Sequence, residues 1–242
     1  MIPKSNILCI FEGERREGLY FKTIKNLFFS EHSIVTCCYG NDIYELFKEM
    51  RDDPDLDIVE VLRDSIKGKD NSKILKEYDR EQFSQVFLFF DAECHDQKFD
   101  KEELLSIIKV FNEETESGKI FISYPMVEAI RDIPSHEEYI SHKVNLSDCT
   151  GKIYKNSSTN GLKTFIDPRH NELSDWMELI KLNVTKSNFI VSGEKNNAKT
   201  IPEQLDIAEY QIKSIEKDNS IYVLSAYPLF IFHQKSSNLN FI

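Results

Sequence analysis

The fold class is decided by one short stretch, residues 85–93, which reads Gln-Val-Phe-Leu-Phe-Phe-Asp-Ala-Glu. Residues 85–90 form the most hydrophobic short run in the first half of the chain, and apolar and polar side chains do not alternate in it. A run of this kind is typical of a strand buried on both faces, as in a parallel sheet. Because the run stops abruptly at Asp91, we predict a central parallel strand followed at once by the acids Asp91 and Glu93.

Strand-like and helix-like segments alternate on both sides of this run. Parallel neighbours need a crossover connection between them, so this alternation predicts an α/β fold with a parallel-stranded sheet flanked by helices. The periodicity of apolar residues separates the two kinds of segment. Strands are expected at residues 6–11, 33–39, 85–90, 119–123 and 221–224, and helices around residues 19–28, 43–50, 58–66, 104–111, 173–184 and 207–212.

The residue composition of the sequence changes after residue 132. Residues 141–168 are rich in Ser, Asn, Lys, Thr and Gly, and we predict a long loop or irregular insertion there. Helical periodicity returns around Trp176, which we interpret as a core residue. We therefore expect an α/β core over residues 1–132 and a loop-rich, mostly helical C-terminal extension over residues 133–242 that packs on it.

Composition excludes several classes of protein. With 242 residues, 40% of them hydrophobic, the chain is long enough to bury a large core, and its composition excludes a disordered or collagen-like chain. No apolar run approaches the roughly 20 residues that cross a bilayer, and no signal-peptide pattern is present, so we expect a cytoplasmic protein without membrane association. Five cysteines without a Cys-x-x-Cys pair predict reduced, buried thiols. The net charge of −11 disfavours nonspecific coating of nucleic acid, but a metal-dependent nuclease remains compatible with it.

Three carboxylates are expected at one edge of the predicted sheet. Asp91 and Glu93 are two residues apart at a strand end, where alternate side chains point the same way. Glu12 follows the first strand, and ligands of open parallel sheets bind at the carboxyl ends of the strands. Crowded carboxylates repel one another, and Mg²⁺, which prefers oxygen ligands, relieves that repulsion. The residues alone thus predict a candidate metal site, while each acid taken singly could also begin a loop or cap a helix.

Three motifs in order resemble a known family. Residues 12–21, Glu-Gly-Glu-Arg-Arg-Glu-Gly-Leu-Tyr-Phe, resemble the Glu-Gly-Glu-x-x-Glu-x-x-Tyr-Phe signature of RloB-like proteins, a branch of the Toprim superfamily related to the OLD-type nucleases. Residues 91–93 fall where that family has Asp-x-Asp or Asp-x-Glu, and residues 123–128 look like its Ser-Asn-Pro-x-Phe-Glu segment. The resemblance covers about residues 7–130. Arg16 stands where the family usually has Thr, and Tyr124 where it has Asn.

This resemblance implies a Toprim-like fold and a divalent-metal-dependent endonuclease that hydrolyses DNA or RNA phosphodiesters. By resemblance, Glu12, Asp91 and Glu93 hold Mg²⁺ or Mn²⁺, and Glu17 and Glu128 support a second ion or the general base. In such two-ion chemistry one ion activates water and the other stabilises the leaving oxygen. The resemblance further implies an effector of bacterial antiphage defence that works with a partner ABC-class ATPase.

Other functions fit parts of the sequence. A catalytically inactive Toprim-like subunit that docks an ATPase or senses a phage component is favoured by Arg16 and the net acidity. Residues 87–93 also fit a Walker B strand, but no Gly-x-x-x-x-Gly-Lys-Ser/Thr motif is present to bind phosphates. A phosphatase with Asp91 as nucleophile would need a later Gly-Asp-x-x-x-Asp-type loop, which the sequence lacks.

Several further residues near these motifs are candidates without an assigned role. His95 follows the acidic pair and could orient a substrate, but we interpret it as a solvated loop histidine. Arg15 could contact a phosphate, but we interpret it as ordinary surface charge. Lys155 and Lys195 are both candidate catalytic lysines, and the sequence does not favour either of them.

Overall fold

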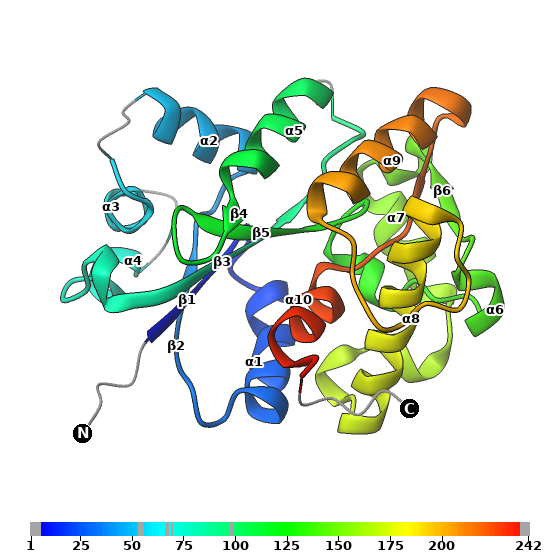
Figure 1. Cartoon of the computed structure of the whole chain (residues 1–242), viewed down its shortest axis with the longest axis horizontal. Helices are drawn as coiled ribbons and strands as arrows, with labels where there is room; N and C mark the ends of the chain where they lie inside the picture. Colours follow the sequence, from blue (N-terminus) through cyan, green and yellow to red (C-terminus); the bar gives the residue numbers. More distant parts are fainter. Residues whose placement is uncertain (1–5, 53–55, 66–67, 69, 97–98, 238–242) are drawn as a thin grey trace. The chain divides into compact units, whose positions relative to one another are not determined.

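A computed structural model describes residues 6–52, 56–65, 68, 70–96 and 99–237 of the chain. It contains a five-stranded sheet in the order β2-β1-β3-β5-β4, accompanied by helices (Figure 1). The predicted α/β class is therefore confirmed. The strands of this sheet are β1 (Asn6–Phe11), β2 (Ser33–Cys38), β3 (Phe83–Asp91), β4 (Asn112–Glu113) and β5 (Gly118–Ser123).

Strand pairing places β3 in the middle of the sheet, as its hydrophobic run predicts. β1 runs parallel to β2 on one side and parallel to β3 on the other, and Phe11 stands opposite Phe89. β5 follows β3 on its other side in the strand order. Residues 86–90 are all buried, which explains why the run needs no polar side chain.

A short hairpin at the edge of the sheet was not predicted. β4 has only two residues and pairs antiparallel with β5. Gly118 begins β5 with φ +118°, and a Cβ atom there would lie 2.6 Å from Leu88 Cδ1. Glycine is therefore required at this position for both conformational and steric reasons.

Helices α1 (Arg16–Phe28) and α2 (Ile43–Asp52) pack on opposite faces of the sheet (Figure 1). On one face, the rings of Phe21 in α1 and Phe89 in β3 have centroids 5.9 Å apart. On the other face, the rings of Phe90 and Tyr39 have centroids 6.4 Å apart, and the Tyr39 hydroxyl is hydrogen-bonded to Glu49 of α2. Because successive strand residues point to opposite faces, Phe89 and Phe90 bury both sides of β3.

Local capping determines where the next helix begins. The carboxylate of Asp57 accepts hydrogen bonds from the N–H groups of Val59 and Glu60 at 2.7 and 3.0 Å, and Glu60 completes the capping box. Such a cap stabilises a helix by about 1 kcal/mol. The helix ends at Asp64, and Ile66 of the predicted helix lies outside the described residues. This helix is α3 (Ile58–Asp64), and it is followed by α4 (Asn71–Ile74), η1 (Arg80–Gln82) and α5 (Lys101–Val110).

Three helices dominate the C-terminal part of the chain; helical periodicity predicted two of them, α8 and α9, and did not predict α10. α8 (Leu173–Ser192) packs against α9 (Gln204–Asp218) and α10 (Ala226–Lys235). Trp176 is fully buried, as its interpretation as a core residue requires. α8 ends at Gly193, whose φ of 79° forms a left-handed C-cap.

Residues 141–168 are not the long loop that the sequence predicts. They include β6 (Lys143–Asn145), which pairs with β7 (Ser220–Tyr222), and α7 (Gly151–Ser157). Tyr154 and Phe165 from this segment are buried, so isolated anchors hold its short elements in the core. The long-loop prediction was wrong because widely spaced anchors produce no periodic pattern, and the alternative of an irregular insertion stays a prediction. The other short helices nearby are η2 (Val127–Arg131), α6 (His136–Tyr139), η3 (Leu146–Cys149), η4 (Ser158–Asn160), η5 (Lys163–Phe165) and η6 (Pro168–His170).

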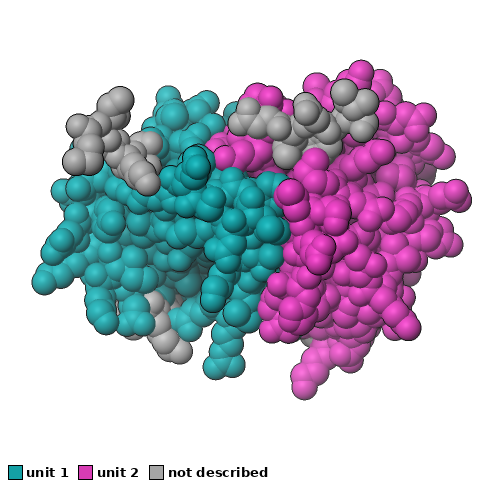
Figure 2. All heavy atoms as spheres, turned by 90° about the horizontal axis from the view of Figure 1, so that it is seen from below, with its two compact units in different colours: residues 1–90, 106–120 teal, residues 91–105, 121–242 magenta. Residues whose placement is uncertain are grey.

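The chain divides into two compact units, coloured separately in Figure 2. One comprises residues 1–90 and 106–120, and the other comprises residues 91–105 and 121–242. The predicted boundary at residue 132 was based on a change of residue composition, whereas these two units are defined by compactness. The division into an α/β core over residues 1–132 and an extension over residues 133–242 therefore stays a prediction.

The predictions from cysteine content and hydropathy can be compared with the structure directly. All five cysteines are free and buried, as predicted. Burial raises the pKa of Cys37 to about 12 and that of Cys149 to about 12, so both remain protonated thiols near neutral pH. Of the helices that the structure describes, none combines the length and the apolarity needed to cross a membrane.

Candidate metal centre

The parallel pairing of β1 and β3 determines where Glu12 lies. The ladder that joins Phe11 to Phe89 continues one residue further, because the Glu12 N–H donates to the Phe89 carbonyl oxygen at 3.1 Å. Asp91, two residues after Phe89, is the last residue of β3. The ends of two adjacent parallel strands thus present their acids at the same edge of the sheet.

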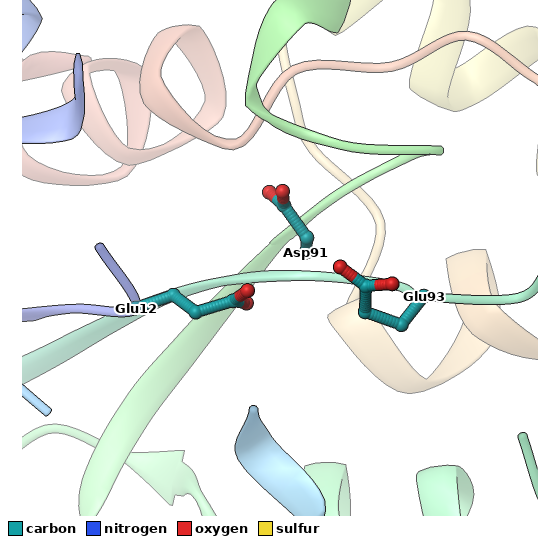
Figure 3. A group of neighbouring side chains, drawn as sticks. All are labelled: Glu12, Asp91 and Glu93. Carbon is teal, nitrogen blue, oxygen red and sulfur yellow. The ribbon is translucent and has the colours of Figure 1, made fainter. Parts of the chain in front are cut away.

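Glu12, Asp91 and Glu93 form a group of carboxylates at this edge (Figure 3). Each residue offers one carboxylate oxygen, and these oxygens all lie within 4.8 Å of one another. All three side chains are partly buried. The sequence-based expectation that these acids meet is therefore confirmed by the geometry, although Glu12 and Asp91 are 79 residues apart in the chain.

Glu93 has an unusual backbone conformation. Its φ is 48°, in the left-handed region, which costs a residue with a Cβ atom roughly 1–2 kcal/mol. Two backbone hydrogen bonds hold the segment in this shape, from the Ala92 N–H to the Ser123 carbonyl oxygen at 3.0 Å and from the Asp96 N–H to the Glu93 carbonyl oxygen at 2.9 Å. Non-glycine residues in this region cluster at functional sites, because the surroundings must maintain them.

The electrostatics of the group favour a bound cation. Two unit charges of the same sign held 4.8 Å apart repel by about 3 kcal/mol at an effective dielectric constant of about 20. The donor atoms are all carboxylate oxygens, which are the ligands that Mg²⁺ and Mn²⁺ prefer. The residues present therefore fit a hard divalent cation.

His95 lies beside this group rather than in solvent. Its Nε2 atom is 3.6 Å from a carboxylate oxygen of Glu93, and only 15% of its side-chain surface is exposed. The interpretation of His95 as a solvated loop histidine was wrong, because the turn that follows Glu93 folds its ring back against the protein. His95 is thus placed to orient the Glu93 carboxylate.

The structure does not bring the other two predicted acids into the group of three. Glu17 lies in the first turn of α1, and a Cβ atom added to Gly13 would come within 2.9 Å of its carboxylate. Glu128 lies in η2 and is completely buried. Their proposed support of a second ion or of a general base stays a prediction.

The candidate lysines also lie outside the acidic group. Lys155 is exposed on α7, and its carbonyl oxygen accepts a hydrogen bond from Arg131 at 2.6 Å. The Nζ atom of Lys195 lies 5.8 Å from the ring centroid of Phe189, which is a cation–π distance. Neither lysine has a catalytic role supported by these contacts.

The sequence gives no indication of a buried polar cluster around Lys186. This lysine is fully buried in α8, and its Nζ atom donates to the carbonyl oxygens of Tyr139 at 2.6 Å and His142 at 2.8 Å. Nearby, Nε2 of His142 lies 3.1 Å from a carboxylate oxygen of Asp132. Burial lowers the pKa of Lys186, and the negative charge of Asp132 opposes that shift. Because its donors are directed at backbone carbonyls, we interpret the cluster as structural.

Comparison with protein-family models, with curated proteins and with solved structures finds no match to this chain. The function is therefore inferred from the geometry of the acidic group and from the motifs that contain it.

Proposed function

We propose that the chain is a divalent-metal-dependent nuclease of the Toprim class that hydrolyses DNA or RNA phosphodiesters. The observation that carries the proposal is the meeting of Glu12, Asp91 and Glu93 within 4.8 Å at the ends of β1 and β3. The motif resemblance assigns metal binding to these same three residues. Sequence motif and geometry thus support one role for one group of side chains.

The three carboxylates would hold Mg²⁺ or Mn²⁺. When bound, such an ion supplies a nucleophilic water at neutral pH and neutralises charge on the phosphodiester. The chain itself supplies the geometry, because β1 and β3 position the ligands and the strained turn at Glu93 directs the third one. His95, 3.6 Å from Glu93, restricts the orientations that this carboxylate can adopt.

We propose further, from the resemblance of residues 12–21 and 123–128, that the nuclease is an effector of bacterial antiphage defence. The chain lacks a Gly-x-x-x-x-Gly-Lys-Ser/Thr motif, so control by ATP would require a separate ABC-class ATPase. A purified complex of the two proteins whose nuclease activity depends on ATP would support this extension, and ATP-independent cleavage at full rate would contradict it.

The metal-binding part of the proposal can be tested with the purified chain. Mn²⁺ is titrated by isothermal calorimetry into the wild-type protein, Glu12→Gln and the control Glu209→Gln, whose carboxylate lies exposed on α9. We expect Glu12→Gln to weaken Mn²⁺ binding at least tenfold, because it removes one of three charged ligands, and Glu209→Gln to leave it unchanged.

Hydrolysis is measured on labelled single-stranded and duplex DNA and RNA with the same proteins. We expect Mn²⁺-dependent cleavage by the wild type and by Glu209→Gln, and none by Glu12→Gln. Mn²⁺ binding without cleavage, even when a partner ATPase is supplied, would favour the catalytically inactive docking subunit. Absence of both metal binding and cleavage would overturn the proposal.

A further inference from the structure

A cavity of about 530 Å³ lies within the first compact unit. Pockets for small molecules and cofactors measure about 300–1,000 Å³, so this one is large enough for a single nucleotide. The lining residues come from the turn after β1 (Phe11, Gly13, Glu14), from α1 (Gly18, Phe21, Lys22, Lys25), from β2 (Thr36, Cys37, Cys38) and from the segment of α4 (Asp70, Asn71, Ile74).

The cavity begins immediately beside Glu12. The residues on both sides of Glu12 in the chain, Phe11 and Gly13, line it. Cys38, which also lines the cavity, donates from its Sγ atom to the Glu12 carbonyl oxygen at 3.2 Å. A single polynucleotide strand can therefore place one nucleotide in the cavity and the adjacent phosphodiester at Glu12.

The wall formed by α1 carries positive charge. Lys22 and Lys25 are three residues apart and so share one face of the helix. The Nζ atom of Lys25 donates to the Ile34 carbonyl oxygen at 3.1 Å, which fixes its position, whereas Lys22 is exposed. Ammonium groups in this arrangement suit a phosphate group, and phosphate contacts position nucleic acid without selecting its sequence.

The remaining walls suit a base and a sugar. Asn71 is 1% exposed and holds the end of β2 in place, because its side chain pairs with the Cys38 N–H at 3.4 Å and the Cys38 carbonyl oxygen at 2.7 Å. Glu14 and Asp70 place acceptors on the cavity wall, and carboxylates accept hydrogen bonds from exocyclic amino groups of bases. An anionic phosphate and a base with N–H donors together match this mixture of charges better than a purely anionic ligand does.

We propose that this cavity holds one nucleotide of the nucleic-acid substrate, adjacent to the phosphodiester at the acidic group. The inference rests on the proposed nuclease function and adds to it a binding subsite for the flanking nucleotide, built from α1, β2 and α4. In a chain with a net charge of −11, Lys22 and Lys25 supply the cations that contact the phosphate, while Glu14 and Asp70 on the other walls balance their charge.

Gly18→Leu tests the cavity directly. A Cβ atom at Gly18 would meet no other atom within 4 Å, and leucine is the better helix former, so the variant should fold normally while its side chain fills the cavity. The matched control is Asn26→Leu, which introduces the same side chain at an exposed position of α1 outside the lining. Equal or higher melting temperatures of both variants check that the fold is kept.

The readout is the Kd of a fluorescein-labelled 12-nucleotide single strand, DNA or RNA, measured by anisotropy without divalent ions so that no cleavage occurs. We expect Gly18→Leu to weaken binding at least tenfold and Asn26→Leu to leave it within twofold of the wild type. Lys22→Gln should weaken binding about threefold to fivefold. It should also reduce the slope of log Kd against log salt concentration by about one. Lys48→Gln on α2 should do neither, because Lys48 lies outside the lining.

The possible results separate this inference from the function on which it rests. Equal Kd values for Gly18→Leu and Asn26→Leu, in a protein that binds Mn²⁺ and cleaves nucleic acid, would overturn the subsite and leave the nuclease intact. Loss of oligonucleotide binding in Gly18→Leu, in a protein that neither binds Mn²⁺ nor cleaves, would uphold the nucleotide site and overturn the nuclease. Absence of any oligonucleotide binding by the wild type would overturn the subsite.

Discussion

Neutralising one acid of the candidate metal centre should stabilise the metal-free protein while it abolishes metal binding. The change is Asp91→Asn, which keeps the shape of the side chain and removes its charge. At the 4.8 Å limit that separates the carboxylate oxygens, each like-charge pair costs about 3 kcal/mol at an effective dielectric constant of about 20 and about 0.9 kcal/mol in bulk water. Because all three side chains are partly exposed, we expect relief of about 1–2 kcal/mol in total.

The assay is thermal unfolding with and without Mn²⁺. For a chain of this length each kcal/mol shifts the melting temperature by about 2–4 °C, so relief of about 1–2 kcal/mol should make metal-free Asp91→Asn melt about 2–8 °C above the metal-free wild type. Mn²⁺ at about 100 times its Kd should stabilise the wild type by about 2.7 kcal/mol and should have no effect on the variant. The control Glu209→Gln should behave as the wild type under both conditions.

One result would refute this reasoning. If metal-free Asp91→Asn melts below the wild type, the carboxylate contributes to stability as a loop or cap residue, and the repulsion inferred from the geometry is not what dominates at this site. If Mn²⁺ does not change the melting temperature of the wild type, the interpretation of the three carboxylates as a metal site is refuted as well. The opposite signs of the two expected effects are typical of binding sites, where stability is sacrificed for function.

Three further predictions concern the stability and the titration of the fold. Gln211→Leu should cost about 2 kcal/mol in urea unfolding, because the amide of Gln211 makes two hydrogen bonds of 2.9 Å to the backbone of Tyr222, whereas Glu209→Leu on the same helix should change stability by less than about 0.5 kcal/mol. Gly193→Ala should cost about 1 kcal/mol by the same measurement through its φ of 79° alone, since no atom lies within 4 Å of an added Cβ. Burial raises the pKa of Cys37 to about 12 from an ordinary 9.0, so the folded state holds the thiol proton more tightly than the unfolded state does. The stability that this proton contributes should be complete below pH 9.0 and lost as the pH rises toward about 12. Alkaline denaturation of Cys37→Ala, compared with the wild type, measures this loss.

Local patterns predict the larger elements of this fold correctly. β1 and β3 are long apolar runs with turn residues at their ends, and α1 and α8 carry apolar residues at helical spacing. The physical reason is that a long element must bury a whole face, and this requirement is visible in the sequence as periodicity. β4 and α7 escape prediction for lack of a pattern, because β4 has only two residues and α7 buries Tyr154 between exposed neighbours.

The candidate metal centre was predicted in part. Glu12, Asp91 and Glu93 could be named because each follows a strand that was itself predictable and because the motifs place them together. The position of His95 against Glu93 could not be foreseen, since it depends on a turn whose φ of 48° no sequence rule assigns to glutamate. Lys186 was missed for a similar reason, because a lysine in a helix is expected at the surface and its carbonyl partners come from residues more than forty positions away.

The amino-acid sequence by itself determined which segments become strands and helices and which acids stand at the strand ends, because those properties depend on neighbours a few residues apart. Only the tertiary structure decided that Glu12 lies within reach of Asp91 and Glu93, and that Gly18 and Lys22 border a cavity beside them. The reason is that β1 pairs with β3 over a long stretch of chain, since Phe11 and its partner Phe89 are 78 positions apart, and such a pairing depends on the packing of both sheet faces rather than on any local pattern.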